Sequence, residues 1–255
     1  MDLELRDRAF LITGATDGLG LALAHTLIDE GARVAICGRS EQRLAAARTQ
    51  LGERALCITC DVTVPDQLDA FIDETLSTFQ RLDGAVNNAG ASSSSPVASS
   101  TSEAWRADFE LKVVPAVTVA RSCLDALAAT EGSILNILSI TAKAPGANTT
   151  PTAASRAAGL ALTKSLASEV APRHVRANAI LIGLIESGQW DRAAAGADMA
   201  VGDLYDVMAK NARIPLGRVG RAQEFAALAA FVLSPKASYL TGAAINLDGG
   251  LSPVV

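Results

Sequence analysis

The chain has 255 residues, of which 49% are apolar and only 4% aromatic, and its formal net charge at neutral pH is -5. Binding to nucleic acid or to a membrane surface requires a basic face, so an acidic chain predicts neither partner. No apolar run is long enough to cross a bilayer, and no cleavable leader with a basic flank is recognisable, so we expect a soluble cytoplasmic protein.

Strand-like and helix-like segments alternate along the whole chain. Short apolar runs rich in small aliphatic residues predict strands at Phe10–Thr13, Arg33–Cys37, Ala55–Cys60, Gly84–Val86, Ser133–Leu138, Val175–Leu181 and Ala243–Leu247. The segments between them predict helices at Leu19–Glu30, from Ser40 to about Gln50, from Pro65, at Trp105–Ala129 with a kink at Pro115, at Thr152–Val170 and at Gln223–Leu233. This alternation predicts an α/β fold: one Rossmann domain over residues 1–255, with a doubly wound parallel β-sheet and helices on both faces.

Residues 186–213 form a long connection between a strand and the next helix. This stretch carries Trp190, Met199, Tyr205 and Met208 among polar residues. Long connections at the carboxyl edge of such a sheet commonly cover substrates, so we expect a substrate lid here. The alternative is a surface excursion whose apolar side chains only fill its own underside.

A glycine-rich turn with the sequence TGATDGLG joins the first strand to the first helix. Its glycines Gly14, Gly18 and Gly20 permit a tight turn, a close approach of the backbone to a pyrophosphate, and packing of the helix on the sheet. Backbone N–H groups at the start of the helix then receive the negative charge. We therefore expect coenzyme contacts from this turn, including Thr16, Asp17 and Leu19.

The end of the second strand indicates which dinucleotide binds. A site for NAD(H) would place a carboxylate here, but the chain has Gly38, Arg39 and Ser40. The Arg39 guanidinium can pair with a 2′-phosphate, which favours NADP(H), with NAD(H) as the alternative. Asp17 argues in the other direction because it adds negative charge to the same region. Arg39 could equally be a solvated residue at a helix start.

Further motifs follow the later strands: Asp61-Val62, Asn87-Asn88-Ala89-Gly90, Ser139 and Gly183-Leu184-Ile185-Glu186-Ser187. Together with the TGxxxGxG spacing of the glycine turn, they resemble the short-chain dehydrogenase/reductase family, and its 3-oxoacyl-acyl-carrier-protein reductases in particular. The resemblance covers nearly the whole chain. It implies a small-molecule substrate and a homotetramer or homodimer, with coenzyme contacts at Asp61, Val62, Asn88, Ala89, Gly90, Arg156, Gly183, Ile185 and Ser187. No metal site is expected, because the CxxC at Cys57 and Cys60 lacks further ligands and suits a buried strand.

The catalytic residues of the resembled family are largely replaced. The family's serine corresponds to Ser139, but its tyrosine and lysine correspond to Thr152 and Arg156. Its asparagine corresponds to Glu110. We hypothesise that Glu110 and Arg156 form a buried ion pair, because an unpaired buried carboxylate would be costly. If Glu110 is buried without a partner, its pKa should rise and it becomes a candidate proton donor.

Three functions remain open from the sequence. The first is an NADP(H)-dependent oxidoreductase of a small carbonyl or alcohol compound that works without the tyrosine and lysine. The second is a catalytically silent nucleotide-binding protein, acting as a sensor or a subunit partner. The third is a lyase or isomerase on the same scaffold, because a fold does not fix a function.

Overall fold

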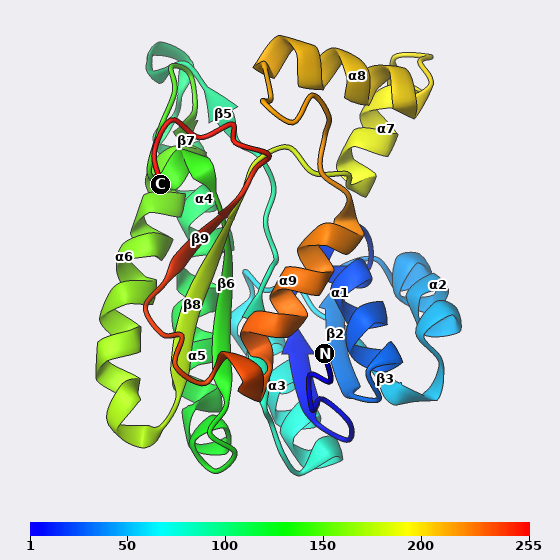
Figure 1. Cartoon of the computed structure of the whole chain (residues 1–255), viewed down its shortest axis with the longest axis vertical. Helices are drawn as coiled ribbons and strands as arrows, with labels where there is room; N and C mark the ends of the chain where they lie inside the picture. The colour runs from blue at the N-terminus through cyan, green and yellow to red at the C-terminus, as the bar shows by residue number, and fades with distance from the viewer.

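The computed structural model describes residues 1–255 and is built around one parallel sheet of seven strands (Figure 1). The strands are β1 Ala9–Ile12, β2 Arg33–Gly38, β3 Ala55–Thr59, β4 Gly84–Asn87, β6 Ser133–Ser139, β8 Arg176–Ile182 and β9 Ala244–Leu247. Their order across the sheet is β3-β2-β1-β4-β6-β8-β9. From β1, the chain adds β2 and β3 on one side of the sheet, and then β4 and the later strands on the other side. At such a switch point a crevice opens at the carboxyl ends of the strands. The predicted Rossmann-type α/β fold is confirmed.

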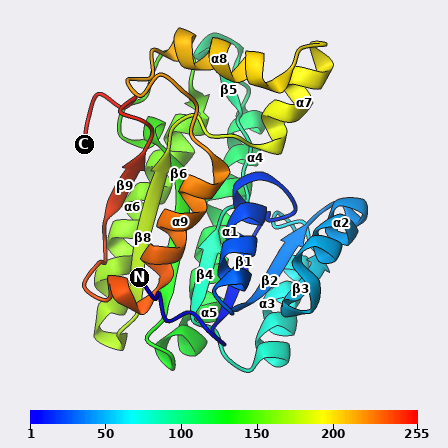
Figure 2. The same ribbon diagram turned by 45° about the vertical axis from the view of Figure 1, so that its right-hand side comes forward.

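Helices cover both faces of the sheet (Figures 1 and 2). One face carries α1 Gly18–Asp29, α2 Glu41–Leu51 and α9 Ala222–Leu233, and the other carries α3 Pro65–Phe79, α5 Val114–Ala128 and α6 Thr152–Val170. Strand β1 shows how the sequence fills both layers: Phe10 and Ile12 enter one core cluster, while Ala9 and Leu11 enter the other. This alternation follows from the two-residue repeat of a strand whose two faces are both covered.

The cysteines belong to these cores. All four (Cys37, Cys57, Cys60 and Cys123) are free and buried, as expected for small apolar side chains. No helix combines the length and the apolar character needed to cross a membrane.

Several shorter elements lie around the sheet. The antiparallel pair β5 Ser94–Ser95 and β7 Thr150–Pro151 and the two helices α7 Gly188–Gly196 and α8 Val201–Ala212 lie beyond the carboxyl ends of the strands (Figure 1). Five 3-10 turns complete the chain: η1 Gly52–Arg54, η2 Val97–Ser99, η3 Ile140–Ala142, η4 Ala171–Arg173 and η5 Pro235–Ala237.

The segment 105–129 departs from the sequence prediction of one kinked helix. It forms two helices, α4 Ser102–Lys112 and α5, separated at Val113, whose φ and ψ are -109° and -54°. Pro115 lies in the first turn of α5. A proline lacks an N–H donor, and its ring clashes with the carbonyl group four residues earlier, so the first helix ends and a second begins. Lys112 thereby becomes the last residue of α4.

Candidate active site

A cleft with a cavity volume of about 470 Å³ opens at the carboxyl ends of the strands. Most of the residues predicted from the sequence line it, namely Gly14, Thr16, Asp17, Gly18, Leu19, Arg39, Asp61, Val62, Asn88, Ala89, Gly90, Ser139, Thr152, Arg156, Gly183, Ile185 and Ser187. Gly20, Ser40 and Glu110 do not line it. Sequence reasoning missed Arg43, Gln189 and Arg192, which also line the cleft.

The glycine turn and the Asn-Asn-Ala-Gly segment are held together as one unit. Thr13 Oγ1 accepts hydrogen bonds from the N–H groups of Asn88 and Ala89, both at 3.1 Å. Asn88 Nδ2 donates in return to the carbonyl oxygens of Thr13, at 2.9 Å, and Gly14, at 2.8 Å. Gly14 has a φ of +64°, and a Cβ atom on it would lie 2.8 Å from Ala89 Cα. This close contact requires glycine and forms the backbone floor of the cleft.

Gly20 and Ser40 act outside the cleft. A Cβ atom on Gly20 would lie 2.6 Å from Asn88 Nδ2, so this glycine lets α1 pack against the Asn88 side chain. Ser40 Oγ accepts a hydrogen bond from Arg43 N at 3.3 Å and caps α2. Gly20 and Ser40 therefore have structural roles in this region, and coenzyme contacts from them stay a prediction.

Arg39 lies at the expected edge of the cleft and is largely free. Its side chain is 74% exposed, and Nη1 lies 3.8 Å from the carboxylate of Asp61. Asp61 is oriented by hydrogen bonds from Thr63, at 3.0 Å from the N–H group and 2.7 Å from the hydroxyl group. A guanidinium this exposed can turn toward an incoming anion at little cost.

The hydroxyl group of Thr152 is polarised by two donors. Its Oγ1 accepts hydrogen bonds from Lys112 Nζ at 3.0 Å and from Ser93 N at 2.8 Å. Thr152 starts α6, and its side chain lines the cleft. Since a hydroxyl group has one proton and two lone pairs, its own proton remains available to a group in the cleft.

Lys112 is part of a buried network that the sequence did not reveal. Its ammonium group forms an ion pair with Asp108, one helical turn earlier in α4, and both side chains are 1% exposed. The Asp108 carboxylate also accepts a hydrogen bond from Ser155 Oγ at 2.5 Å, which joins α4 to α6. Burial lowers the pKa of Lys112, and the positive charge of Arg156 lowers it further, while Asp108 opposes both effects.

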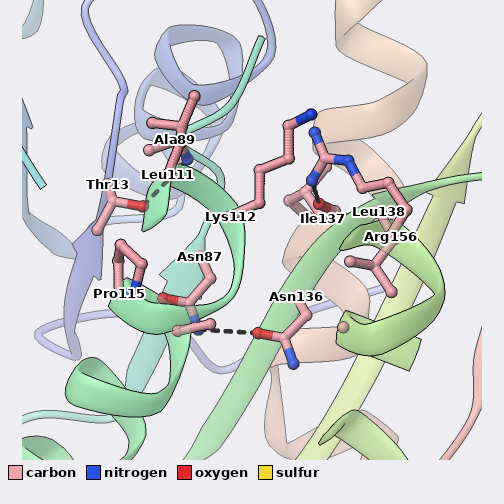
Figure 3. A pocket seen from close by; sticks show the side chains of 12 residues that line it. Thr13, Asn87, Ala89, Leu111, Lys112, Pro115, Asn136, Ile137, Leu138 and Arg156 are labelled. Atoms are coloured by element: carbon pink, nitrogen blue, oxygen red, sulfur yellow. Dashed lines mark hydrogen bonds between the residues drawn. The ribbon is translucent and has the colours of Figure 1, made fainter. Parts of the chain in front are cut away.

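Arg156 shares a small pocket with Lys112 (Figure 3). Its Nη1 donates to the carbonyl oxygen of Ile137 at 2.7 Å, and a Cβ atom on Gly90 would lie 2.7 Å from Nη2. Burial lowers the pKa of Arg156 to about 10. Its Nε is buried without a hydrogen-bond partner, which indicates a donor held ready for a ligand.

The proposed ion pair between Glu110 and Arg156 is wrong. Glu110 is exposed, and no ion pair joins it to Arg156, so it is neither a buried partner nor a buried proton donor. The reason is helical geometry: side chains two residues apart point about 200° away from each other around the axis. Because Asp108 and Lys112 face α6, Glu110 faces solvent. The i, i+4 spacing of Asp108 and Lys112 is the signal that could have identified the inward pair.

Part of the segment 186–213 lines the cleft and part packs away from it. Gln189, Trp190 and Arg192 of α7 line the cleft, and a role of this segment as a lid stays a prediction. Tyr205 and Met208 of α8 instead pack against a small separate core around Ala209, Ile214 and Val219. Trp190 is thus the large apolar side chain that this segment presents to the cleft.

Comparison with known proteins assigns the family. The model of a family described as enoyl-(acyl carrier protein) reductase matches residues 14–252. A 3-oxoacyl-[acyl-carrier-protein] reductase of Chlamydia pneumoniae is 30% identical over 262 aligned positions, which cover 99% of this chain and all of the relative. The chain belongs to the short-chain dehydrogenase/reductase family.

Solved structures of this family agree closely with the fold. The NADPH-bound short-chain oxidoreductase of Pseudomonas aeruginosa, described as containing an atypical catalytic center, has a TM-score of 0.92 at 37% identity and covers 98% of this chain and 100% of its own. The L-sorbose reductase of Gluconobacter frateurii, complexed with NADPH and L-sorbose, has a TM-score of 0.94 at 30% identity, with complete coverage of both chains.

Proposed function

We propose that this chain is an NADP(H)-dependent oxidoreductase of a small carbonyl or alcohol compound, with Thr152 and Lys112 transferring the proton in place of a tyrosine. The proposal rests on the surroundings of the Thr152 hydroxyl group. This group accepts hydrogen bonds from Lys112 Nζ and Ser93 N, and Thr152 lines the cleft. A bare threonine hydroxyl is a poor acid, but a neighbouring ammonium group supplies both a proton and charge stabilisation.

The cleft fits a dinucleotide coenzyme. The close contacts at Gly14 and Gly90 leave no room for side chains where the backbone approaches the cleft, and the start of α1 offers free N–H groups for a diphosphate. Arg39 and Arg43 would hold the 2′-phosphate, and Arg156 would hold the nicotinamide end through its unpaired Nε. The NADPH found in both structural neighbours supports this choice. When bound, the coenzyme supplies or accepts a hydride.

The protein's own residues would handle the proton. In the reduction direction, Thr152 donates its proton to the substrate oxygen and takes one from Lys112 Nζ, which leaves a neutral amine. The lowered pKa of Lys112 favours this release, and Asp108 keeps the amine in place. In the oxidation direction the same protons move in reverse, and the neutral amine is the base.

Ser139 would orient the substrate oxygen. Its Oγ accepts hydrogen bonds from Thr141, at 3.3 Å from the N–H group and 3.1 Å from the hydroxyl group. With both lone pairs engaged, the hydroxyl proton of Ser139 points to another acceptor, and Ser139 lines the cleft. Two hydroxyl donors, Ser139 and Thr152, would thus polarise one carbonyl group.

The test is turnover by the purified protein with a panel of ketones, aldehydes and polyols, followed through NADPH absorbance. Thr152→Val removes the hydroxyl group at nearly constant volume and should lower kcat by a factor of about 10² to 10⁴. Thr152→Ser keeps the hydroxyl group and serves as the matched control, with activity close to that of the wild type. Equal activity of the valine and serine variants would refute the role of Thr152.

The same measurements separate the two other functions. Coenzyme binding without turnover on any panel compound would favour a silent nucleotide-binding protein. Substrate conversion without any change in coenzyme absorbance would favour a lyase or isomerase. The buried Lys112–Asp108 pair beside Thr152 favours an enzyme over a silent binding protein, because such a pair is costly to bury unless it serves the site.

We also propose that the protein is a homo-oligomer. Val114 and Val117 lie one helical turn apart on α5 and are each 45% exposed, and contact with a second copy would cover them. Light scattering coupled to size exclusion should give a mass of two or four chains. Val117→Lys should reduce that mass.

A further inference from the structure

Asp17 stands where its side chain would normally compete with the coenzyme. It is the N-cap residue of α1, a position where an aspartate usually accepts hydrogen bonds from the first N–H groups of the helix. These are the groups that receive the diphosphate of a dinucleotide. An aspartate that capped α1 would therefore occupy the anion site with its own negative charge.

The structure shows that Asp17 does not cap the helix. Its side chain makes no capping hydrogen bond, although its backbone has the extended conformation of an N-cap residue, with φ -155° and ψ 177°. Instead, Asp17 Oδ2 accepts a hydrogen bond from Arg192 Nη1 at 2.8 Å. Arg43 Nη1 approaches the same oxygen at 3.9 Å. Two cations from outside α1 hold the carboxylate.

The local packing is shaped around this ion pair. Arg192 belongs to α7, whose first residue is Gly188. A Cβ atom on Gly188 would lie 2.9 Å from Asp17 Oδ2 and 3.0 Å from Arg192 Nη1, so a side chain here would disturb both partners. Asp17 and Arg192 both line the cleft. The ion pair thus lies at the mouth of the coenzyme site, between the glycine turn and the lid.

We propose that Arg192 is a positioning residue for the coenzyme diphosphate: it holds the Asp17 carboxylate away from the N–H groups at the start of α1 and neutralises its charge. The inference rests on the proposed coenzyme binding. It explains why a chain with an acidic residue in the glycine turn can still accept a dianionic diphosphate. Arg43 provides a second, more distant counter-charge, so the loss of Arg192 weakens binding without abolishing it.

The experiment is a double-mutant cycle read by coenzyme binding, not by activity. The proteins are the wild type, Arg192→Gln, Asp17→Asn and the double variant, and each is titrated with NADPH and with NADH by calorimetry. Arg192→Gln should weaken the binding of both coenzymes by about three- to tenfold, because both share the diphosphate. Asp17→Asn should bind as tightly as the wild type or more tightly. The double variant should bind within about twofold of Asp17→Asn.

Recovery of coenzyme affinity in the double variant distinguishes the positioning role of Arg192 from two other roles. If Arg192 contacts the coenzyme directly, the double variant stays as weak as Arg192→Gln. If the ion pair matters only because it docks the lid, Asp17→Asn alone weakens binding as much as Arg192→Gln. Either result, or wild-type affinity in Arg192→Gln, overturns the inference.

Two controls keep the outcome unambiguous. Arg173→Gln removes an exposed arginine whose ion pair with Asp125 has a 2.7 Å contact outside the cleft, and it should leave coenzyme affinity unchanged. A wild-type protein that binds neither NADPH nor NADH would instead refute the proposed function itself. Thermal unfolding without coenzyme confirms that each variant is folded before titration.

Discussion

The pH dependence of catalysis gives the most direct test of the buried network. In the proposed mechanism, reduction requires a protonated Lys112, so its rate should fall as the pH rises through the pKa of this group, which burial holds below the usual value near 10.5. Oxidation requires the neutral amine and should gain rate over the same range. The pH–rate profiles of the two directions should therefore share one midpoint pH, around which the rate of reduction falls and the rate of oxidation rises.

Asp108→Asn moves that midpoint in a predictable direction. The amide keeps the shape of the side chain and can still bond to Lys112 and Ser155, but it removes the negative charge that raises the pKa of Lys112. Loss of an opposite charge at ion-pair distance shifts a pKa by about 1 to 3 units. The midpoint should therefore move about 1 to 3 pH units toward acid, so reduction loses rate at lower pH than in the wild type.

The assay is kcat/KM for NADPH oxidation and for NADP⁺ reduction from pH 6 to 10 at constant ionic strength. Ser155→Ala is the control, because it removes a neutral donor to Asp108 and should shift the midpoint by less than about 1 unit. The chain has only five lysines, so nuclear magnetic resonance of ¹³C-labelled lysine can follow Lys112 directly. A folded Asp108→Asn protein whose midpoint and lysine titration both match the wild type would refute the reasoning.

Three further outcomes are expected. Arg39→Gln should weaken NADPH binding by about ten- to a hundredfold and leave NADH binding unchanged, which parallel titrations would measure; equal losses would contradict 2′-phosphate recognition. Gly90→Ala should displace the Arg156 guanidinium, since the added Cβ atom would lie 2.7 Å from Nη2, and coenzyme affinity should fall. The Arg218 guanidinium lowers the pKa of Glu224 to about 2, so the stability that Glu224 adds is present above its ordinary pKa near 4.5 and is lost as the pH falls through 2. Glu224→Gln should therefore cost about 0.5–1 kcal/mol at pH 7 and nothing below pH 2, as measured by urea unfolding.

The candidate coenzyme-binding residues could be predicted because short-range sequence patterns determine where they lie. The glycine turn Gly14–Gly20 needs glycine wherever the backbone passes close to Ala89 or Asn88, and such requirements remain visible in the sequence. Arg39 could be placed because it follows shortly after the apolar run that predicts the second strand. For Ser40, only the structure shows that its hydroxyl group accepts a hydrogen bond from Arg43 N and caps α2.

The residues that surround Thr152 could not be predicted, because they depend on which side of α4 faces α6. The sequence positions Glu110 at the place of a family asparagine, but the side chain that enters the site comes from Lys112. The end of α4 at Val113, caused by Pro115, and the short hydrogen bond from Ser155 to Asp108 together fix the rotation of the helix. The hydrogen bond joins residues that are distant in the chain, so the sequence does not reveal it.

The sequence by itself therefore determined the family, the α/β fold, the coenzyme cleft and the loss of the tyrosine at Thr152. The tertiary structure alone decided what surrounds Thr152: Lys112, held by Asp108, lies within hydrogen-bond distance of its hydroxyl group, and on this arrangement the proposed proton transfer rests. It also decided that Asp17 does not cap α1 but bonds to Arg192 of α7. The physical reason is common to both cases. A charged side chain selects its partner by burial and distance in space, and the sequence reports neither.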